Sequence, residues 1–309
     1  MTARATAATA GRMAPIALLR ALRPYQWPKG IIVFAAFAFS AGDAWELNDV
    51  SSWWPLWWRV ALLFGAWCLV SSATYLLNDV RDREADSLHP RKRQRPVASG
   101  EVAPRLAIAA ALLLAAGGIG GAMALDPGAA VVLAGYLVTM VAYTFGLKHV
   151  AVLDILILSA GVVARAASGA LVIDVEISPW LYICSSFGSF FFAASKRWAE
   201  VRELGADAAR HRASLGLYSA ETLGQLVMTG AAGSLISYAI YTIESPHVPT
   251  NGAMAATIPF VAFAMFRYLL LLNGPRRGEA PDRILFTDPQ ILAAVGGFSL
   301  TAMWVLLAT

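Results

Sequence analysis

Apolar stretches of about 20 residues recur along the whole chain, and they restrict it to a helical membrane protein. The 309 residues are 58% hydrophobic and only 14% charged, whereas soluble domains average about 25% charged residues. A helix needs about 20 apolar residues to cross the hydrocarbon core of a bilayer. The sequence therefore predicts an all-α, polytopic membrane protein with nine transmembrane helices. The predicted spans are 28–42, 58–78, 104–125, 128–146, 150–173, 179–198, 221–243, 253–272 and 289–308.

The lysines and arginines between these spans indicate how the protein is oriented. With the N-terminus inside, every Lys and Arg except Arg59 and Arg165 falls in an inner segment. The outer segments, near 43–57, 126, 174–178 and 244–252, contain acidic residues but no Lys or Arg. This positive-inside asymmetry places the N-terminus and the inner loops on the cytoplasmic face of the cell membrane. The net charge of +4 is then a topology signal, and we expect no nucleic-acid partner.

No linker, low-complexity block or short-period repeat divides the chain. We predict a cytoplasmic tail and interfacial segment over 1–27, followed by a single catalytic membrane domain over 28–309. Two longer inner segments, near 79–105 and 196–219, are polar and periodic enough to be partly helical. We expect them to cap a central cavity that opens to the cytoplasmic face. The sequence leaves the oligomeric state open, a homo-oligomer included.

Three aspartates follow the second predicted span and form the main candidate metal site. Asp79, Asp82 and Asp86 are three and four residues apart, which places them on one face of a continuing helix. Carboxylates so close repel one another unless a cation lies among them, and Mg²⁺ prefers oxygen ligands that it shares with substrate phosphates. The alternative is a solvated helix extension, but a carboxylate beside an apolar run is costly without a partner. We predict that the three bind Mg²⁺ and a diphosphate, supported by the amide of Asn78.

Basic residues near the same boundary are candidate phosphate ligands. Lys29 opens the first span, and Arg95 lies where the chain returns to the membrane; each can bind a phosphate or serve only as an interface or topology residue. Lys196 and Arg197 lie at the exit of the sixth span, and we prefer them as ligands for a second anion. A solvated amphipathic helix explains most other charges of that segment.

Further polar residues surround the inner turn between the fourth and fifth spans. Tyr143 and Lys148 bracket this turn, and Asp154 lies about one helical turn inside, so it is either paired or functional. Arg165 lies deeper in the fifth span. An isolated charge there is costly, so a carboxylate or an anionic ligand should face it, and we favour a structural ion pair.

The motif Asn78-Asp79-x-x-Asp82-x-x-x-Asp86 resembles the first aspartate-rich motif of the UbiA-type intramembrane prenyltransferases. Nine spans with large inner loops after the second and sixth also fit that family. The resemblance implies an enzyme that binds a polyprenyl diphosphate through Mg²⁺ and alkylates an aromatic or other acceptor. The family normally carries a second aspartate-rich motif after the sixth span.

This chain departs from that pattern, because Ser195-Lys196-Arg197 places two cations where an aspartate pair is expected. Together with Arg23-Pro24-x-x-Trp27-x-Lys29, Tyr143-Thr144-x-x-Leu147-Lys148 and Val163-Ala164-Arg165-Ala166, it resembles the branch of decaprenyl-phosphate phosphoribosyltransferases of cell-wall arabinan synthesis. That resemblance implies transfer of 5-phosphoribose from 5-phosphoribosyl 1-diphosphate to a polyprenyl phosphate, with release of diphosphate. The residues that we expect to bind the substrates are Lys29, Asn78, Arg95, Tyr143, Lys148, Asp154, Lys196 and Arg197.

The charge pattern is compatible with this reaction. One carboxylate–Mg²⁺ site suits one diphosphate donor, and a second basic site suits an anionic acceptor better than a neutral aromatic ring. A phosphate monoester is already ionised near pH 7, so no general base is needed. Two alternatives remain: a prenyltransferase acting on an aromatic acid or quinone precursor, and a transporter or lipid flippase. The small number of polar residues within the spans counts against the transporter.

Overall fold

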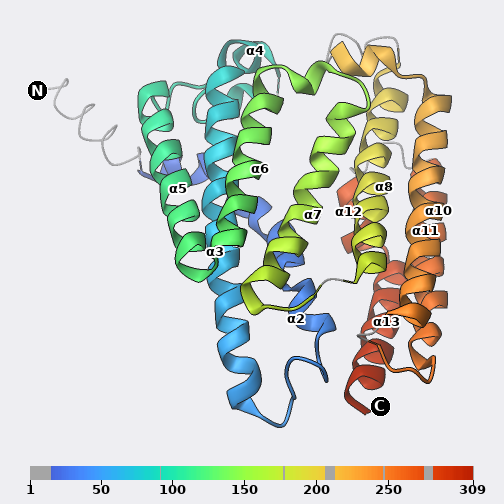
Figure 1. Ribbon diagram of the computed structural model, residues 1–309. Helices are drawn as coiled ribbons and strands as arrows, with labels where there is room; N and C mark the ends of the chain where they lie inside the picture. Colours follow the sequence, from blue (N-terminus) through green and yellow to red (C-terminus); the bar gives the residue numbers. More distant parts are fainter. Residues whose placement is uncertain are drawn as a thin grey trace, which may run out of the picture.

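The chain folds as a bundle of long helices that lie side by side (Figure 1). The computed structural model describes residues 15–90, 92–176, 178–205, 213–245, 248–274 and 281–308, and within these ranges it contains no β-strand. The long helices are α3 (Val50–Arg81), α5 (Pro104–Leu125), α6 (Pro127–Phe145), α7 (Leu153–Ile173), α8 (Pro179–Leu204), α10 (Ala220–Glu244), α11 (Ile258–Asn273) and α13 (Pro289–Ala308). The short elements are η1 (Pro24–Phe34), α2 (Ala35–Phe39), α4 (Arg83–Leu88), η2 (Lys92–Gln94), η3 (Leu147–His149), η5 (Ala213–Leu217), η6 (Ala253–Thr257) and α12 (Pro281–Thr287).

Seven helices of the described ranges are long and apolar enough to cross a membrane, against nine predicted. The predicted span 179–198 lies within α8, which is long enough but is rich in serine and ends in charged residues. The predicted span 28–42 is wrong as a single transmembrane helix, because the 3₁₀ helix η1 gives way to only five residues of α2. Pro24 and Pro28 lie in η1, and proline has no backbone N–H to donate to a regular α-helix.

Helix α3 begins earlier than the sequence predicts, within the segment assigned to an outer loop. Asp49 caps its first turn by accepting a hydrogen bond from the backbone N–H of Ser51 at 2.9 Å. The tryptophan cluster lies on the helix itself, with the rings of Trp54 and Trp57 stacked at a centroid distance of 5.4 Å. At 1.5 Å per residue, its 32 residues span about 48 Å, which exceeds the hydrocarbon core of about 30 Å. Part of α3 therefore extends beyond the apolar layer.

Close helix packing fixes where η1 and the long helices lie. Helix α3 packs against α5, α6 and η1, α8 packs against α10, and α7 contacts both groups. A Cβ atom on Gly169 of α7 would lie 2.0 Å from the carbonyl oxygen of Val33 in η1. A Cβ on Gly118 of α5 would lie 2.8 Å from the carbonyl oxygen of Ala66 in α3. Glycine at these two contacts lets the backbones approach, as is common between membrane helices.

One end of the bundle collects the polar elements. Figure 1 shows α4 beside the end of α3, at the same end as the last turns of α8. The segments predicted to cap a cavity, near 79–105 and 196–219, are partly helical as expected, through α4, η2, the end of α8 and η5. Residues 206–212 of the second segment and 1–14 of the predicted tail lie outside the described residues, while 15–21 are helical. The orientation in the membrane stays a prediction.

Candidate active site

The three aspartates lie where α3 gives way to α4. Helix α3 ends at Arg81, and Asp82 occupies the junction. The backbone stays close to helical, because the N–H of Asp82 donates to the carbonyl of Asn78 at 2.9 Å and that of Asp86 donates to the carbonyl of Asp82 at 2.8 Å. The carboxylates nevertheless form two groups, since Asp79 and Asp86 contact one cation and Asp82 another. The prediction of one continuing helix is wrong, because α3 ends at Arg81 and α4 begins at Arg83, while the shared metal site stays a prediction.

Arg95 joins Asp79 to Asp86. Its Nη1 atom lies 3.2 Å from Oδ1 of Asp79 and 2.6 Å from Oδ2 of Asp86, and both aspartates are buried. Arg23 donates to the same Oδ1 of Asp79 at 2.5 Å, and its guanidinium lies over the ring of Tyr75 at 5.0 Å. The other oxygen of Asp79, Oδ2, is buried and has no hydrogen-bond partner among the described residues.

Asp82 faces the turn between α6 and α7. The Nζ atom of Lys148, in η3, lies 2.8 Å and 3.1 Å from the two oxygens of Asp82. Asn78 is half-buried, one residue before Asp79, and in the part of the chain that the structure describes its side chain makes no hydrogen bond. The structure thus brings Lys148 and Arg95 to the aspartates, and it leaves the Asn78 amide available beside them.

A pocket of about 200 Å³ opens next to Asp79. Its wall contains three arginines, Arg20, Arg23 and Arg95, together with Tyr25. Arg20 is itself paired with Glu101. Arginine presents several N–H donors in a planar fork that matches phosphate oxygens, so this pocket is suited to an anionic phosphate group.

A second acid–cation cluster surrounds Asp154 at the start of α7. Asp154 is fully buried, and its Oδ2 accepts from Nε of Arg197 at 3.0 Å and from the hydroxyl of Ser214 at 3.3 Å. Its Oδ1 accepts from the hydroxyl of Tyr218 at 2.8 Å. Burial raises the pKa of Tyr218 to about 12, so the phenol keeps its proton well above neutral pH. The two carboxylate oxygens of Asp154 therefore both have partners within the chain.

Arg197 completes this second cluster. Its Nη1 lies 2.9 Å from Oε2 of Glu200, and its Nη2 lies 3.5 Å from the hydroxyl of Tyr143. Lys196, the preceding residue of α8, is half-buried. Tyr143, Asp154 and Arg197, which the sequence nominated as substrate ligands, thus contact one another rather than Asp79 or Asp86. Their contacts favour a positioning role, with Arg197 already neutralised by two carboxylates.

A central cavity of about 190 Å³ lies between η1, α3, α6 and α7. Lys29 lines it together with Tyr75, Tyr136 and Arg165, and its role as a phosphate ligand stays a prediction. The structural ion pair favoured for Arg165 is wrong for the described residues. Its guanidinium instead donates to the carbonyl of Gly161 at 2.7 Å and to the hydroxyl of Tyr136 at 3.2 Å.

Comparison with known proteins shows the family to which this chain belongs. A sequence model of the UbiA prenyltransferase family matches residues 35–287. Decaprenyl-phosphate phosphoribosyltransferase of Mycolicibacterium smegmatis is 36% identical over 282 residues, which cover 88% of this chain and 86% of that protein. The protein of the same name from Corynebacterium glutamicum is 33% identical over 290 residues, which cover 92% and 85%. The chain belongs to the UbiA prenyltransferase family.

Membership of the UbiA family makes this chain a multi-pass membrane protein and a transferase. A solved UbiA homologue from Archaeoglobus fulgidus, bound to GPP and Mg²⁺, has the same fold, with a TM-score of 0.69. It is 15% identical, and the match covers 95% of this chain and 100% of that one. The helical membrane architecture expected from the apolar stretches and the UbiA-type fold implied by the aspartate motif are thus confirmed, although the count of nine spans is not.

The acidic motif of this UbiA-family protein offers ligands of the right kind for a divalent cation. Its three carboxylates are hard oxygen donors, and Oδ2 of Asp79 is a buried acceptor whose missing hydrogen bond costs about 1–3 kcal/mol. No group of three or more His, Cys, Asp or Glu side chains is arranged to hold a metal in the described ranges. Arg23, Arg95 and Lys148 contact the carboxylates directly and supply their counter-charges.

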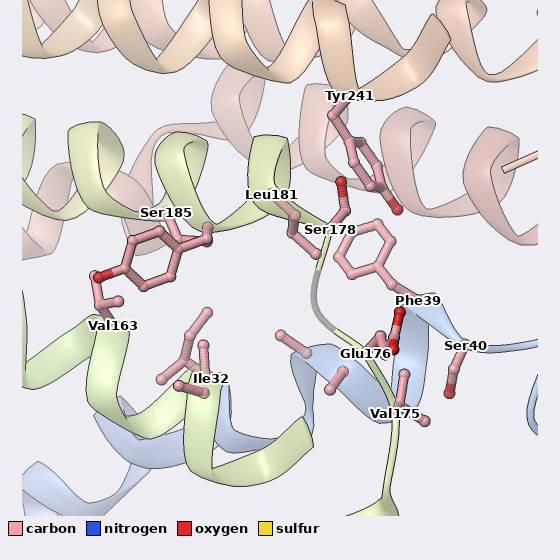
Figure 2. A pocket seen from close by; sticks show the side chains of 15 residues that line it. Ile32, Phe39, Ser40, Val163, Val175, Glu176, Ser178, Leu181, Ser185 and Tyr241 are labelled. Atoms are coloured by element: carbon pink, nitrogen blue, oxygen red, sulfur yellow. The ribbon is translucent and has the colours of Figure 1, made fainter. Parts of the chain in front are cut away.

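An apolar pocket of about 110 Å³ lies farther along α7, away from the aspartates. Figure 2 shows Ile32, Val163 and Leu181 around it, with the rings of Phe39 and Tyr241 at one side. Its wall belongs to η1, α2, α7, α8, α10 and the segment between α7 and α8. Apart from Glu176 and several hydroxyl groups, the lining is hydrocarbon, which suits an apolar chain.

The sequence did not predict Arg20 and Arg23 as site residues, although Arg23 belongs to the motif Arg23-Pro24-x-x-Trp27-x-Lys29. Both arginines lie in the basic segment before the first apolar run. Such a segment usually only sets the orientation of a membrane protein, so it did not indicate a binding site. Tyr218 and Ser214 were also missed, because neither lies near Asp154 in sequence. Only the packing of η5 against the turn at η3 brings them together.

Proposed function

We propose that this protein transfers 5-phosphoribose from 5-phosphoribosyl 1-diphosphate to a polyprenyl (decaprenyl) monophosphate and releases diphosphate. Relatives named for this activity are 33–36% identical over most of their length. The observation that carries the proposal is the charge of the two spaces beside the acidic motif. The pocket next to Asp79 is lined by Arg20, Arg23 and Arg95, and the central cavity by Lys29 and Arg165. Two cationic spaces suit two anionic substrates.

Asp79, Asp82 and Asp86 would hold Mg²⁺ together with the donor diphosphate, and the ion would neutralise charge on the leaving group when bound. Arg95 and Lys148 already lie within hydrogen-bond distance of these carboxylates. When the diphosphate enters, the side chains of Arg95 and Lys148 exchange a carboxylate oxygen for a phosphate oxygen. They then stabilise the negative charge that develops as the C1–O bond breaks.

The transfer needs no proton acceptor in the site. An oxygen of the lipid phosphate attacks C1 of the ribose from the face opposite the diphosphate, so the new C1–O bond forms with inversion. The acceptor phosphate is already ionised near pH 7, because the second pKa of a phosphate monoester is about 6. The chain's residues therefore bind and orient the two anions, and Tyr143, Asp154 and Arg197 support the helix ends that carry the ligands.

The acceptor lipid explains why the site is built in a membrane bundle. Its phosphate would lie in one of the two spaces lined by cations, and its hydrocarbon chain would lie along the bundle, for which the apolar pocket of Figure 2 is a candidate. With the orientation predicted from the Lys and Arg positions, the site faces the cytoplasm of the cell. The product would be a precursor for cell-wall arabinan.

The proposal is tested by a transfer assay with purified protein in detergent. Donor labelled in the ribose is incubated with decaprenyl phosphate and Mg²⁺, and label is measured in the organic phase. We expect transfer that EDTA abolishes and added Mg²⁺ restores. Transfer of a prenyl group from labelled prenyl diphosphate to an aromatic acid, without any ribose transfer, would establish the alternative prenyltransferase reaction instead.

A further inference from the structure

Arg165 lies in the middle of α7 and is held only by neutral groups. Its guanidinium lies 4.7 Å from the ring centroid of Trp67 and 5.0 Å from that of Tyr136. It donates to the carbonyl of Gly161 at 2.7 Å and to the hydroxyls of Ser71 and Tyr136 at 3.2 Å each. These contacts orient the guanidinium but leave its positive charge uncompensated.

Other arginines of the bundle are neutralised in ways that Arg165 is not. Arg23, Arg95 and Arg197 each contact a carboxylate. Arg59 donates to the carbonyls of Leu125 and Val172, which lie at the negative ends of the α5 and α7 dipoles. Within the described ranges, Arg165 forms no salt bridge. A guanidinium inside an apolar helix is costly unless an anion or a water-filled cavity faces it.

We propose that Arg165 binds a phosphate monoester in the central cavity, with Lys29 as the second cation. Both residues line that cavity, and no acidic side chain is among its lining residues. Tyr75, Tyr136 and Ser71 supply hydroxyl groups in the same wall. An arginine fixed by aromatic rings has little conformational freedom left to lose on binding, and its remaining N–H groups form charge-assisted hydrogen bonds.

The position of this cavity relates it to the acidic motif. Ser71, which contacts Arg165, lies on α3 eight residues before Asp79, which corresponds to about 12 Å along the helix axis. The two sites are thus separate, yet close enough to hold two anionic groups of one reaction. On the proposed function, the monoester is either the 5-phosphate of the donor or the phosphate of the acceptor lipid. Both groups are phosphate monoesters, so the same cations can bind either of them.

The direct test measures phosphate binding without turnover. Ribose 5-phosphate and farnesyl phosphate are titrated against purified protein in metal-free detergent buffer, and binding is followed by calorimetry. We expect at least one of them to bind the wild type. Arg165→Gln should weaken that binding by about tenfold or more, Arg165→Lys should restore part of it, and Arg59→Gln should leave it unchanged.

Kinetics then identify the source of the phosphate. If the donor supplies it, Arg165→Gln raises KM for 5-phosphoribosyl 1-diphosphate; if the lipid supplies it, KM for decaprenyl phosphate rises. Should Arg165→Gln fail to fold, Lys29→Gln is measured in its place. Unchanged binding of both monoesters in a folded variant overturns the inference. Arg165-dependent binding in a protein that transfers no ribose would reject the proposed function and leave this site standing.

Discussion

Two clusters of aspartate and arginine lie at the same end of the bundle, and they differ in whether the chain satisfies their charges. Around Asp79, one carboxylate oxygen has no partner among the described residues, and a pocket adjoins the arginines. Around Asp154, both carboxylate oxygens accept hydrogen bonds and the side chain is fully buried. The same residue types therefore prepare a binding site in one region and a fixed framework in the other.

The difference has a physical consequence for exchange of partners. Arg95 keeps 27% of its side chain exposed, so it can leave a carboxylate for a phosphate without crossing an apolar layer. Arg197 keeps only 7% exposed and meets carboxylates on two sides. Moving it would leave Asp154 buried without its counter-charge, which is strongly unfavourable.

The largest expected effect is that of Asp82→Ala on turnover. Removing this carboxylate takes away a proposed metal ligand and the partner of Lys148, and we expect ribose transfer to fall about 100-fold or more. The protein should remain folded, because the Asp82 side chain is 29% exposed. The transfer assay and the melting temperature in detergent are the measurements. Glu84→Ala, at an exposed position of α4, is the matched control, and near-normal turnover of Asp82→Ala would falsify the metal assignment.

If the cluster around Asp154 serves as a structural framework, substitutions in it should lower the stability of the protein and leave its catalytic turnover nearly unchanged. Asp154→Leu leaves the buried Arg197 with the partly exposed Glu200 as its remaining counter-charge and takes the acceptor from the hydroxyls of Ser214 and Tyr218. We expect a loss of about 3–5 kcal/mol in the free energy of unfolding. The double variant Asp154→Leu/Arg197→Met should recover most of that loss, because no buried charge then lacks its partner. Denaturant unfolding in detergent measures both variants.

The same double variant separates the two clusters functionally. We expect its turnover per folded molecule to stay close to that of the wild type. A well-folded double variant without activity would instead show that Arg197 is a substrate ligand, as its sequence position suggested, and the contrast between the two regions would fail.

The smallest expected effect concerns the titration of Tyr218. Its pKa of about 12 in the folded protein exceeds the ordinary value of about 10. The protonated phenol therefore stabilises the fold fully below about pH 10, and this contribution is lost as the pH rises to about 12. We expect the melting temperature of the wild type to fall more steeply over this interval than that of Tyr218→Phe. Equal slopes would contradict the raised pKa of the buried Tyr218 phenol.

The sequence by itself determined the helical membrane class, the acidic motif and some of the cations near it, among them Arg95 and Lys148. Hydrophobic stretches and the spacing of Asp79, Asp82 and Asp86 are local properties, so they can be read without knowing the fold. Local reading failed at 28–42, where Pro24 and Pro28 favour a 3₁₀ helix over a regular span. It also failed at 43–57, where α3 begins early.

Only the tertiary structure decided which charges meet. Arg23 reaches Asp79 across 56 positions, and Lys148 reaches Asp82 across 66. Such contacts depend on how the helices pack, for example on the close approach of η1 to α7 at Gly169, and no local pattern encodes them. Packing likewise closed the cluster around Asp154 and left Arg165 facing a cavity, because burial and partners are set by neighbours distant in the chain.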